Sequence, residues 1–204
     1  MIRDHDRSGW FGASDTARIM GSWETETFRR WWLEKLGLVQ NRFCSRAMAA
    51  GTAYEHRILD AVGVRQRDRQ IKVRRLRLRV NLDGEDRETV HEVKTYGKER
   101  FRVTRAYWQQ CQVEMFAARK RCRIVAYRLT EQDYRNFFNP IDPDRLSFHP
   151  VEYDPEWIET EYLPRLRYLA KCLRERRIPN AADFEREGDR LRAGERGADH
   201  PGPV

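Results

Sequence analysis

The chain has 204 residues, 35% of them charged and 40% hydrophobic, which is typical of one folded domain and not of a disordered chain. Its 40 Lys and Arg residues exceed its 32 Asp and Glu residues, and the resulting charge of +8 favours a phosphate-rich partner. No apolar stretch has the length of a membrane span, and the polar first residues do not form a secretory signal. We therefore expect a cytoplasmic protein that does not contact membranes.

The cysteines give no sign of a metal or iron–sulfur site. They stand apart in the chain and show no C-x2-C spacing, so we expect reduced thiols packed in the core and no iron–sulfur cluster. No internal repeat or linker divides the sequence. It predicts one domain over residues 1–187 and a tail without regular structure over 188–204, where Gly, Arg and Pro are frequent.

Three helices are expected in the first third of the chain. Capping residues and apolar periodicity predict them over residues 14–20, 25–36 and 45–61. A glycine stands just beyond each one and ends it: Gly21, Gly37 and Gly63.

Strands follow. Residues 71–82 alternate in polarity and predict one long strand, with a turn at 84–87 and a return strand at 89–95. One face of the long strand would carry the apolar residues Leu76, Leu78, Val80 and Leu82. The other would carry Arg75, Arg77, Arg79, Asn81 and Asp83.

The rest of the chain alternates between helix and strand. We expect a helix over residues 105–119, strands over 122–129 and 146–153, and a last helix over 154–176. This order predicts an α/β fold with a small mixed sheet flanked by helices.

The hairpin carries the residues that point to chemistry. Its turn would place Asp83 beside Glu92, and the two-residue period of a strand puts Glu92 and Lys94 on the same face. Adjacent carboxylates repel each other unless a cation joins them, and Mg²⁺ prefers such oxygen ligands. A bound Mg²⁺ can polarise a phosphodiester and activate water, and a lysine beside it can offset developing charge. The alternative is an ordinary hairpin with solvated charges.

Five sequence blocks stand in a recognisable order: Gly12-Ala13-Ser14-Asp15, the G-x-x-x-E segment Gly51–Glu55, Asp83-Gly84, Glu92-Val93-Lys94 and the glutamine helix with Gln110 and Gln112. In this order they resemble the lambda-exonuclease/YqaJ-like viral recombinase group of the PD-(D/E)XK nucleases. The resemblance covers residues 7–130, with Leu82 where the family often has Pro.

The resemblance implies a restriction-endonuclease-like core and a set of site residues. Asp83, Glu92 and the Val93 carbonyl would hold one Mg²⁺, and Glu55 would help to hold a second. Lys94 would act on the attacking water. Ser14 and the glutamines Gln110 and Gln112 would contact phosphate or its water network. Arg7, seven residues before Ser14, would receive the DNA 5′-phosphate.

The sequence therefore predicts a Mg²⁺-dependent DNA nuclease, with Mn²⁺ able to substitute and two ions per site. The resemblance favours a 5′–3′ exonuclease on double-stranded ends in phage-type recombination or repair. It also implies a homo-oligomer and a single-strand annealing protein as partners. Two alternatives remain open: an endonuclease of a defence or restriction-type system, and a DNA-binding module without turnover. Arg75, Arg77 and Arg79 are either a phosphate track towards the metals or a solvated strand face.

Overall fold

The computed structural model describes residues 7–40 and 45–197, and it contains a five-stranded mixed sheet in the order β1-β2-β3-β4-β5. Strands β3 and β4 are parallel, and the other neighbours are antiparallel. The predicted mixed sheet is thus confirmed. The strands are β1 Gln66–Val73, β2 Leu78–Glu85, β3 Thr89–Tyr96, β4 Arg121–Arg128 and β5 Leu146–Val151.

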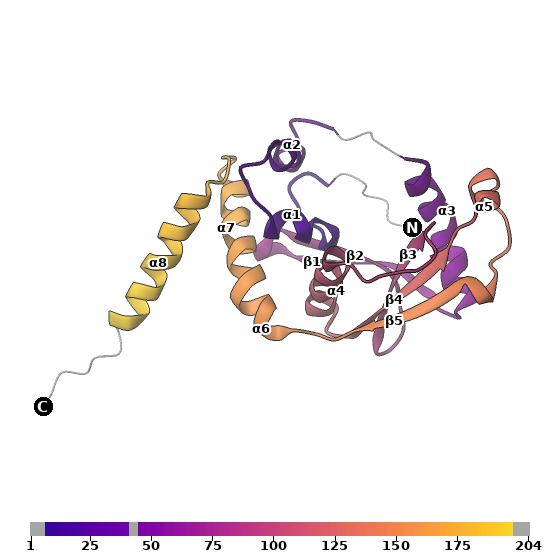
Figure 1. Cartoon of the computed structure of the whole chain (residues 1–204). Coiled ribbons are helices and arrows are strands. Elements are labelled where there is room, and N and C mark those ends of the chain that lie inside the picture. Colours follow the sequence, from indigo (N-terminus) through magenta and orange to yellow (C-terminus); the bar gives the residue numbers. More distant parts are fainter. Residues whose placement is uncertain (1–6, 41–44, 198–204) are drawn as a thin grey trace, which may run out of the picture.

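Helices cover both faces of the sheet, and Figure 1 shows α1, α2 and α7 at the end of the molecule opposite α3 and α5. The helices are η1 Ala13–Asp15, α1 Thr16–Met20, α2 Glu26–Lys35, α3 Arg46–Ala61, η2 Arg74–Leu76, α4 Arg105–Ala118, α5 Glu131–Arg135, η3 Pro143–Arg145, α6 Pro155–Trp157, the π-helical turn η4 Ile158–Tyr162, α7 Leu163–Arg174 and α8 Ala181–Gly197.

Two hydrophobic clusters hold the layers together. In β4, Ile124 belongs to the larger cluster with α4 and α7, whereas the next residue, Val125, belongs to a smaller cluster under α3. This alternation follows from the two-residue period of a strand that is buried on both faces. Tyr54 and Ile58 of α3 complete the smaller cluster. Helix α3 is therefore fixed against β3 and β4 by apolar contacts on one face of the helix.

The predicted helix starts are confirmed by capping bonds. The hydroxyls of Thr25, Ser45 and Thr104 accept hydrogen bonds from backbone amides three residues later, at 3.1, 3.2 and 3.3 Å. Each bond satisfies an amide that the first turn of a helix leaves without an intrahelical partner. After α2 and α3, Gly37 and Gly63 adopt φ values of 72° and 75°. Glycine accepts this left-handed conformation without steric cost.

The prediction of one long strand over residues 71–82 is wrong. The chain reverses within it: β1 ends at Val73, η2 forms a tight turn, and β2 begins at Leu78 and pairs antiparallel with β1. Arg77 closes this turn with φ 51°. No Gly, Pro or Asn marks the reversal, so the alternation of polar and apolar residues continues through it. The polar edge strand β1 begins at Gln66, upstream of the predicted strand.

The tail also differs from the expectation. Helix α8 runs from Ala181 to Gly197 and extends away from the rest of the molecule (Figure 1). Asn180 begins it, since its side-chain oxygen accepts a hydrogen bond from the Asp183 amide at 3.2 Å. The expected irregular tail is thus helical up to Gly197, and residues 198–204 lie outside the described residues. Within the described ranges, no helix has both the length and the apolar character needed to cross a bilayer.

Candidate active site

The site lies where β2 and β3 separate. These strands pair at Gly84↔His91 and Glu85↔Val90, whereas β3 and β4 pair along eight positions from Thr89↔Arg121 to Tyr96↔Arg128. Past the paired end, the Val93 amide donates a hydrogen bond of 2.9 Å to Oδ2 of Asp83. A side-chain carboxylate thus takes the place of a strand partner, and the gap between the strands becomes available to other groups.

A pocket of about 250 Å³ opens in this gap. The predicted quartet Glu55, Asp83, Glu92 and Lys94 lines it together, although these residues come from α3, β2 and β3. Other predicted site residues also line it: Arg7, Ser14, Arg79, Val93 and Gln110. The structure therefore brings most of the predicted site to one place.

Glu55 reaches the pocket because α3 approaches β2 closely at Gly84. A Cβ atom at position 84 would lie 2.7 Å from Cδ2 of Leu59 and 2.8 Å from Cγ1 of Val64, so a larger residue does not fit without displacement. Leu59 stands one helical turn after Glu55, on a neighbouring part of the helix surface. The glycine after Asp83 thus permits the contact that brings the Glu55 carboxylate next to the strands.

Glu92, Lys94 and Gln110 form a closed hydrogen-bond network. The Lys94 ammonium lies 2.5 Å from Oε1 of Glu92 and donates to Oε1 of Gln110 at 3.2 Å. The Gln110 amide nitrogen donates to Oε1 of Glu92 at 2.6 Å. Helix α4 is thus joined to β3 through Gln110, the glutamine that the sequence motif singles out.

The charges of the pocket shift each other's pKa values. Burial raises the pKa of Asp83 well above its usual range, and the nearby carboxylates of Glu92 and Glu55 raise it further. Burial and Glu92 likewise raise the pKa of Glu55. Burial alone would lower the pKa of Lys94, but the carboxylates of Glu92 and Asp83 outweigh it and raise that pKa. Lys94 is therefore an ammonium at neutral pH, suited to stabilising negative charge and not to accepting a proton.

Among the residues that the structure describes, one buried carboxylate oxygen has no hydrogen-bond partner. Oε2 of Glu92 is inaccessible to solvent and unpaired, while Oε1 of the same group accepts two bonds. An unpaired carboxylate oxygen is costly to bury, and a divalent cation would offset that cost. The oxygens of Glu55, Asp83 and Glu92 are not all within 4.8 Å of one another among the described residues. The donor set, all hard oxygens with an unsatisfied member, nevertheless suits Mg²⁺.

We expect the raised pKa of Asp83 to appear as a pH-dependent stability difference. The folded, metal-free chain holds a proton on Asp83 at pH values where the unfolded chain has released it, so this residue lowers stability as pH rises from about 4. Asp83→Asn removes the effect while keeping a hydrogen-bond acceptor for Val93. In EDTA, the free energy of unfolding of Asp83→Asn should therefore rise relative to wild type between pH 5 and pH 8, as measured by urea denaturation.

Burial also lowers the pKa of His91, but wild type and Asp83→Asn share this residue. Its titration therefore contributes equally to both free energies of unfolding and cancels in their difference. Mg²⁺ should stabilise wild type at pH 8 and have little effect on Asp83→Asn. A difference between the two chains that does not change with pH would contradict the shift of the Asp83 pKa.

Cationic and polar groups surround the other side of the pocket. Arg7 and Ser14 are exposed at its rim, and Arg79 and Asn81 project from β2. Lys35 is 3% exposed, and its ammonium donates to Oδ2 of Asp15 at 2.6 Å. Asp15 also accepts bonds from the Gly12 amide and the Trp31 indole, at 2.8 and 2.9 Å. These buried hydrogen bonds to Asp15 fix the segment that carries Ser14 beside the carboxylates.

The structure does not bring Arg75 and Arg77 to the pocket. Both lie in the turn between β1 and β2, so the expected ladder of Arg75, Arg77 and Arg79 on one strand face does not exist. Arg75 lines a separate cavity of about 1330 Å³ that also includes Arg119 and Lys120, after the end of α4. The Arg77 guanidinium lies 6.0 Å from the ring centre of Trp10. The single strand face that the prediction of a phosphate track required is therefore wrong, whereas contact of these arginines with phosphate stays a prediction.

Gln112 does not reach the pocket either. It is fully buried, and its amide nitrogen donates to the Glu152 carbonyl at 2.7 Å while its oxygen accepts from the Asp154 amide at 2.7 Å. Gln112 therefore fastens the chain after β5 to α4, and its predicted contact with phosphate is wrong. Residues two apart on a helix point to different sides, which explains why Gln110 and Gln112 separate.

Sequence reasoning missed Glu114 and Lys35 as neighbours of the site. Glu114 is fully buried, and its Oε1 accepts from the Gln110 amide at 2.8 Å. The signal was present, because residues four apart share a helix face and a glutamate there is unusual on an apolar helix side. Lys35 gave no such signal, since its burial depends on Asp15, which is distant in sequence.

No protein-family model matches the chain, and no curated protein matches its sequence. Solved structures do resemble it. An alkaline exonuclease from Laribacter hongkongensis aligns with 94% of this chain and 96% of its own, at 16% identity and a TM-score of 0.57. A phage-related exonuclease from Haemophilus somnus 129PT aligns with 82% of this chain and 96% of its own, at 13% identity and a TM-score of 0.56.

These likenesses define the fold class. The chain has the mixed α/β fold of these exonucleases, which is of the restriction-endonuclease-like type. The resemblance to the lambda-exonuclease/YqaJ-like group that the sequence motifs indicated is confirmed at the level of the fold.

Proposed function

We propose that this chain is a Mg²⁺-dependent DNA nuclease of the phage exonuclease type. The observation that carries the proposal is the convergence of Glu55, Asp83, Glu92 and Lys94 on one pocket, with a buried, unpaired oxygen on Glu92. The fold likeness to two exonucleases supports the same reaction class. The charge of +8 fits a phosphate-rich substrate.

Asp83, Glu92 and the Val93 carbonyl would hold one Mg²⁺, and Glu55 would contribute to a second. Mn²⁺ has the same ligand preference and could substitute. Bound ions of this kind polarise a phosphodiester and lower the pKa of water. Glu92 is held in place by the Gln110 amide, so its free oxygen is already directed before a cation arrives.

The residues of the chain have distinct parts in this proposal. The Lys94 ammonium stabilises the negative charge that develops on the phosphate, because its raised pKa keeps it protonated. Arg7 and Ser14, at the rim, would receive a terminal phosphate of the DNA. A 5′-phosphate there would place the first phosphodiester towards the carboxylates and would set a 5′–3′ direction.

The test uses end-labelled linear duplex and covalently closed circular DNA, each with Mg²⁺ or EDTA. We expect release of labelled nucleotides from the linear duplex with Mg²⁺, no release in EDTA, and an intact circle. Duplexes with 5′-phosphate should be degraded about 10-fold faster than those with 5′-hydroxyl ends, because a charge-assisted contact to phosphate contributes roughly 1.5 kcal/mol or more.

Arg7→Ala should remove this preference for the 5′-phosphate, and Arg29→Ala, an exposed arginine on α2, is the matched control that should keep it. Cleavage of the closed circle would instead indicate an endonuclease. Inactivity on every form of DNA with Mg²⁺ or Mn²⁺ would indicate a DNA-binding module. A homo-oligomer and a single-strand annealing partner remain proposals that rest on the resemblance alone.

A further inference from the structure

The Gln110 amide stands between three charged or ionisable groups. Its nitrogen donates to Oε1 of Glu92 and to Oε1 of Glu114, at 2.6 and 2.8 Å, and its oxygen accepts from Lys94 at 3.2 Å. The orientation of the amide matters here, because its oxygen and nitrogen ends have nearly the same shape and differ in whether they accept or donate. The reversed amide would face two carboxyl oxygens with its oxygen and an ammonium with its nitrogen.

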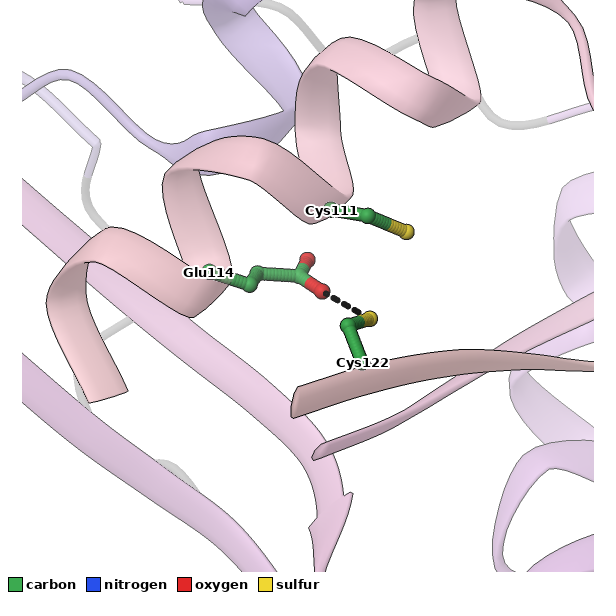
Figure 2. Close-up of side chains that lie close together, drawn as sticks. All are labelled: Cys111, Glu114 and Cys122. Carbon is green, nitrogen blue, oxygen red and sulfur yellow. Dashed lines mark hydrogen bonds between the residues drawn. The ribbon is translucent and has the colours of Figure 1, made fainter. Parts of the chain in front are cut away.

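Glu114 is placed one helical turn after Gln110 and has no contact with solvent. Figure 2 shows its carboxyl group between α4 and β4, directed towards Cys122, with Cys111 nearby on the same helix. Its Oε2 lies 3.8 Å from Sγ of Cys122. One oxygen of Glu114 thus contacts the core, and the other contacts the amide that holds the catalytic network.

We propose that Glu114 is a positioning residue: it fixes the Gln110 amide in the orientation that directs the Lys94 ammonium towards the carboxylates. The inference rests on the proposed nuclease function, because Lys94 acts in that reaction. Glu92 alone would hold the amide less firmly in this orientation, since the same carboxylate is also expected to bind a cation. Glu114 is buried away from the pocket and can hold the amide throughout.

The same cluster could instead bind a soft metal ion. Cys111, Glu114 and Cys122 offer donor atoms that all lie within 4.8 Å of one another. The structure favours the positioning role for two reasons. Both oxygens of Glu114 already have a hydrogen-bond donor, the Gln110 amide at 2.8 Å and the Cys122 thiol at 3.8 Å, and contact with Cys111 together with burial raises the pKa of Cys122. A protonated thiol is a poor metal ligand, since metals bind thiolates.

The experiment compares two substitutions of Glu114 in the full chain. Glu114→Leu keeps the volume and removes the acceptor, whereas Glu114→Gln keeps an oxygen that can accept from Gln110. Val113→Ala is the matched control, because Val113 is equally buried on the same helix and has no part in the network. For each variant we would measure kcat and KM on linear duplex, the Mg²⁺ concentration for half-maximal activity, Mn²⁺ affinity without DNA, and Tm.

We expect Glu114→Leu to lower kcat about 100-fold with little change in KM, because a small displacement of a catalytic group can cost this much. Its half-maximal Mg²⁺ concentration and its Mn²⁺ dissociation constant should both rise. Glu114→Gln should stay within about 3-fold of wild type, which is small beside that loss. Val113→Ala should lower Tm and leave kcat unchanged. A merely structural role for Glu114 would not separate kcat from KM in this way.

Three results would overturn the proposal. The first is wild-type kcat and Mg²⁺ dependence in Glu114→Leu, which would leave the nuclease function itself intact. The second is an equal loss of kcat in Val113→Ala. The third is one zinc ion per chain in the purified protein, since Glu114 would then be a ligand. If wild type cleaves no DNA, the proposed function fails, and an unchanged Mn²⁺ affinity in Glu114→Leu would then overturn the positioning role as well.

Discussion

Glu92→Gln is expected to lower the rate of cleavage of a linear duplex by at least about 1000-fold in Mg²⁺, which corresponds to roughly 4 kcal/mol of transition-state stabilisation. The substitution removes the negative charge of the carboxylate whose Oε2 is buried and unpaired. It also ends the ion pair with Lys94, which lies 2.5 Å from the other oxygen. Glutamine has nearly the same shape as glutamate, so the loss of cleavage rate would come from the missing charge and not from altered packing.

The measurement is a time course on end-labelled DNA at saturating enzyme. Glu152→Gln is the matched control, because Glu152 is exposed and does not line the pocket. DNA affinity in Ca²⁺ should change little in either variant. Activity of Glu92→Gln within about 10-fold of wild type would be incompatible with a metal site at this carboxylate, because metal-assisted catalysis contributes several kcal/mol.

Lys94→Met is expected to reduce kcat by about 100-fold to 1000-fold, the range seen when one charge-stabilising donor is removed from an active site. It should also destabilise the metal-free chain by about 3–5 kcal/mol, because it leaves the Glu92 carboxylate buried without its cation. Mg²⁺ or Ca²⁺ should restore much of that stability, since a divalent ion replaces the missing positive charge. Activity would not return with it.

Lys120→Met is the matched control for this prediction. Lys120 is 17% exposed and pairs with the buried Glu85 at 2.6 Å, much as Lys94 is 20% exposed and pairs with Glu92. Glu85 keeps Arg69 as a second partner at 3.0 Å, so the loss of stability should be smaller, and kcat should not change. Equal kcat in Lys94→Met and wild type would remove Lys94 from the chemistry.

Local signals in the sequence were sufficient for most of the fold. Capping residues and terminal glycines located α2, α3 and α4 because each signal acts within a few residues of the helix end. The β1–β2 turn was missed because Arg77 adopts a left-handed conformation, which is uncommon for arginine and which the sequence therefore does not predict. Its stability comes from the strands on either side, which is a tertiary effect. Helix α8 was missed because glycines, which disfavour helix, are spread through its sequence.

The part of the site that could be predicted is the part that the spacing of sequence motifs defines. Asp83, Glu92 and Lys94 follow from one hairpin, and Glu55 followed from the family resemblance; all four line the pocket. The strand face expected for Arg75 is absent and Gln112 lies in the core, because each expectation depended on a regular strand or on a helix side that the local sequence does not define. Glu114 depends on which face of α4 meets β4, and that is decided by packing across the whole sheet.

The gap between β2 and β3 has a mechanical consequence. The sheet consists of two sets of strands, β1–β2 on one side and β3–β4–β5 on the other, and the described ladder joins them at Gly84↔His91 and Glu85↔Val90. Asp83 belongs to the first set and Glu92 to the second. The separation of the two carboxylates therefore depends on these two backbone pairs and on the 2.9 Å hydrogen bond from the Val93 amide to Asp83.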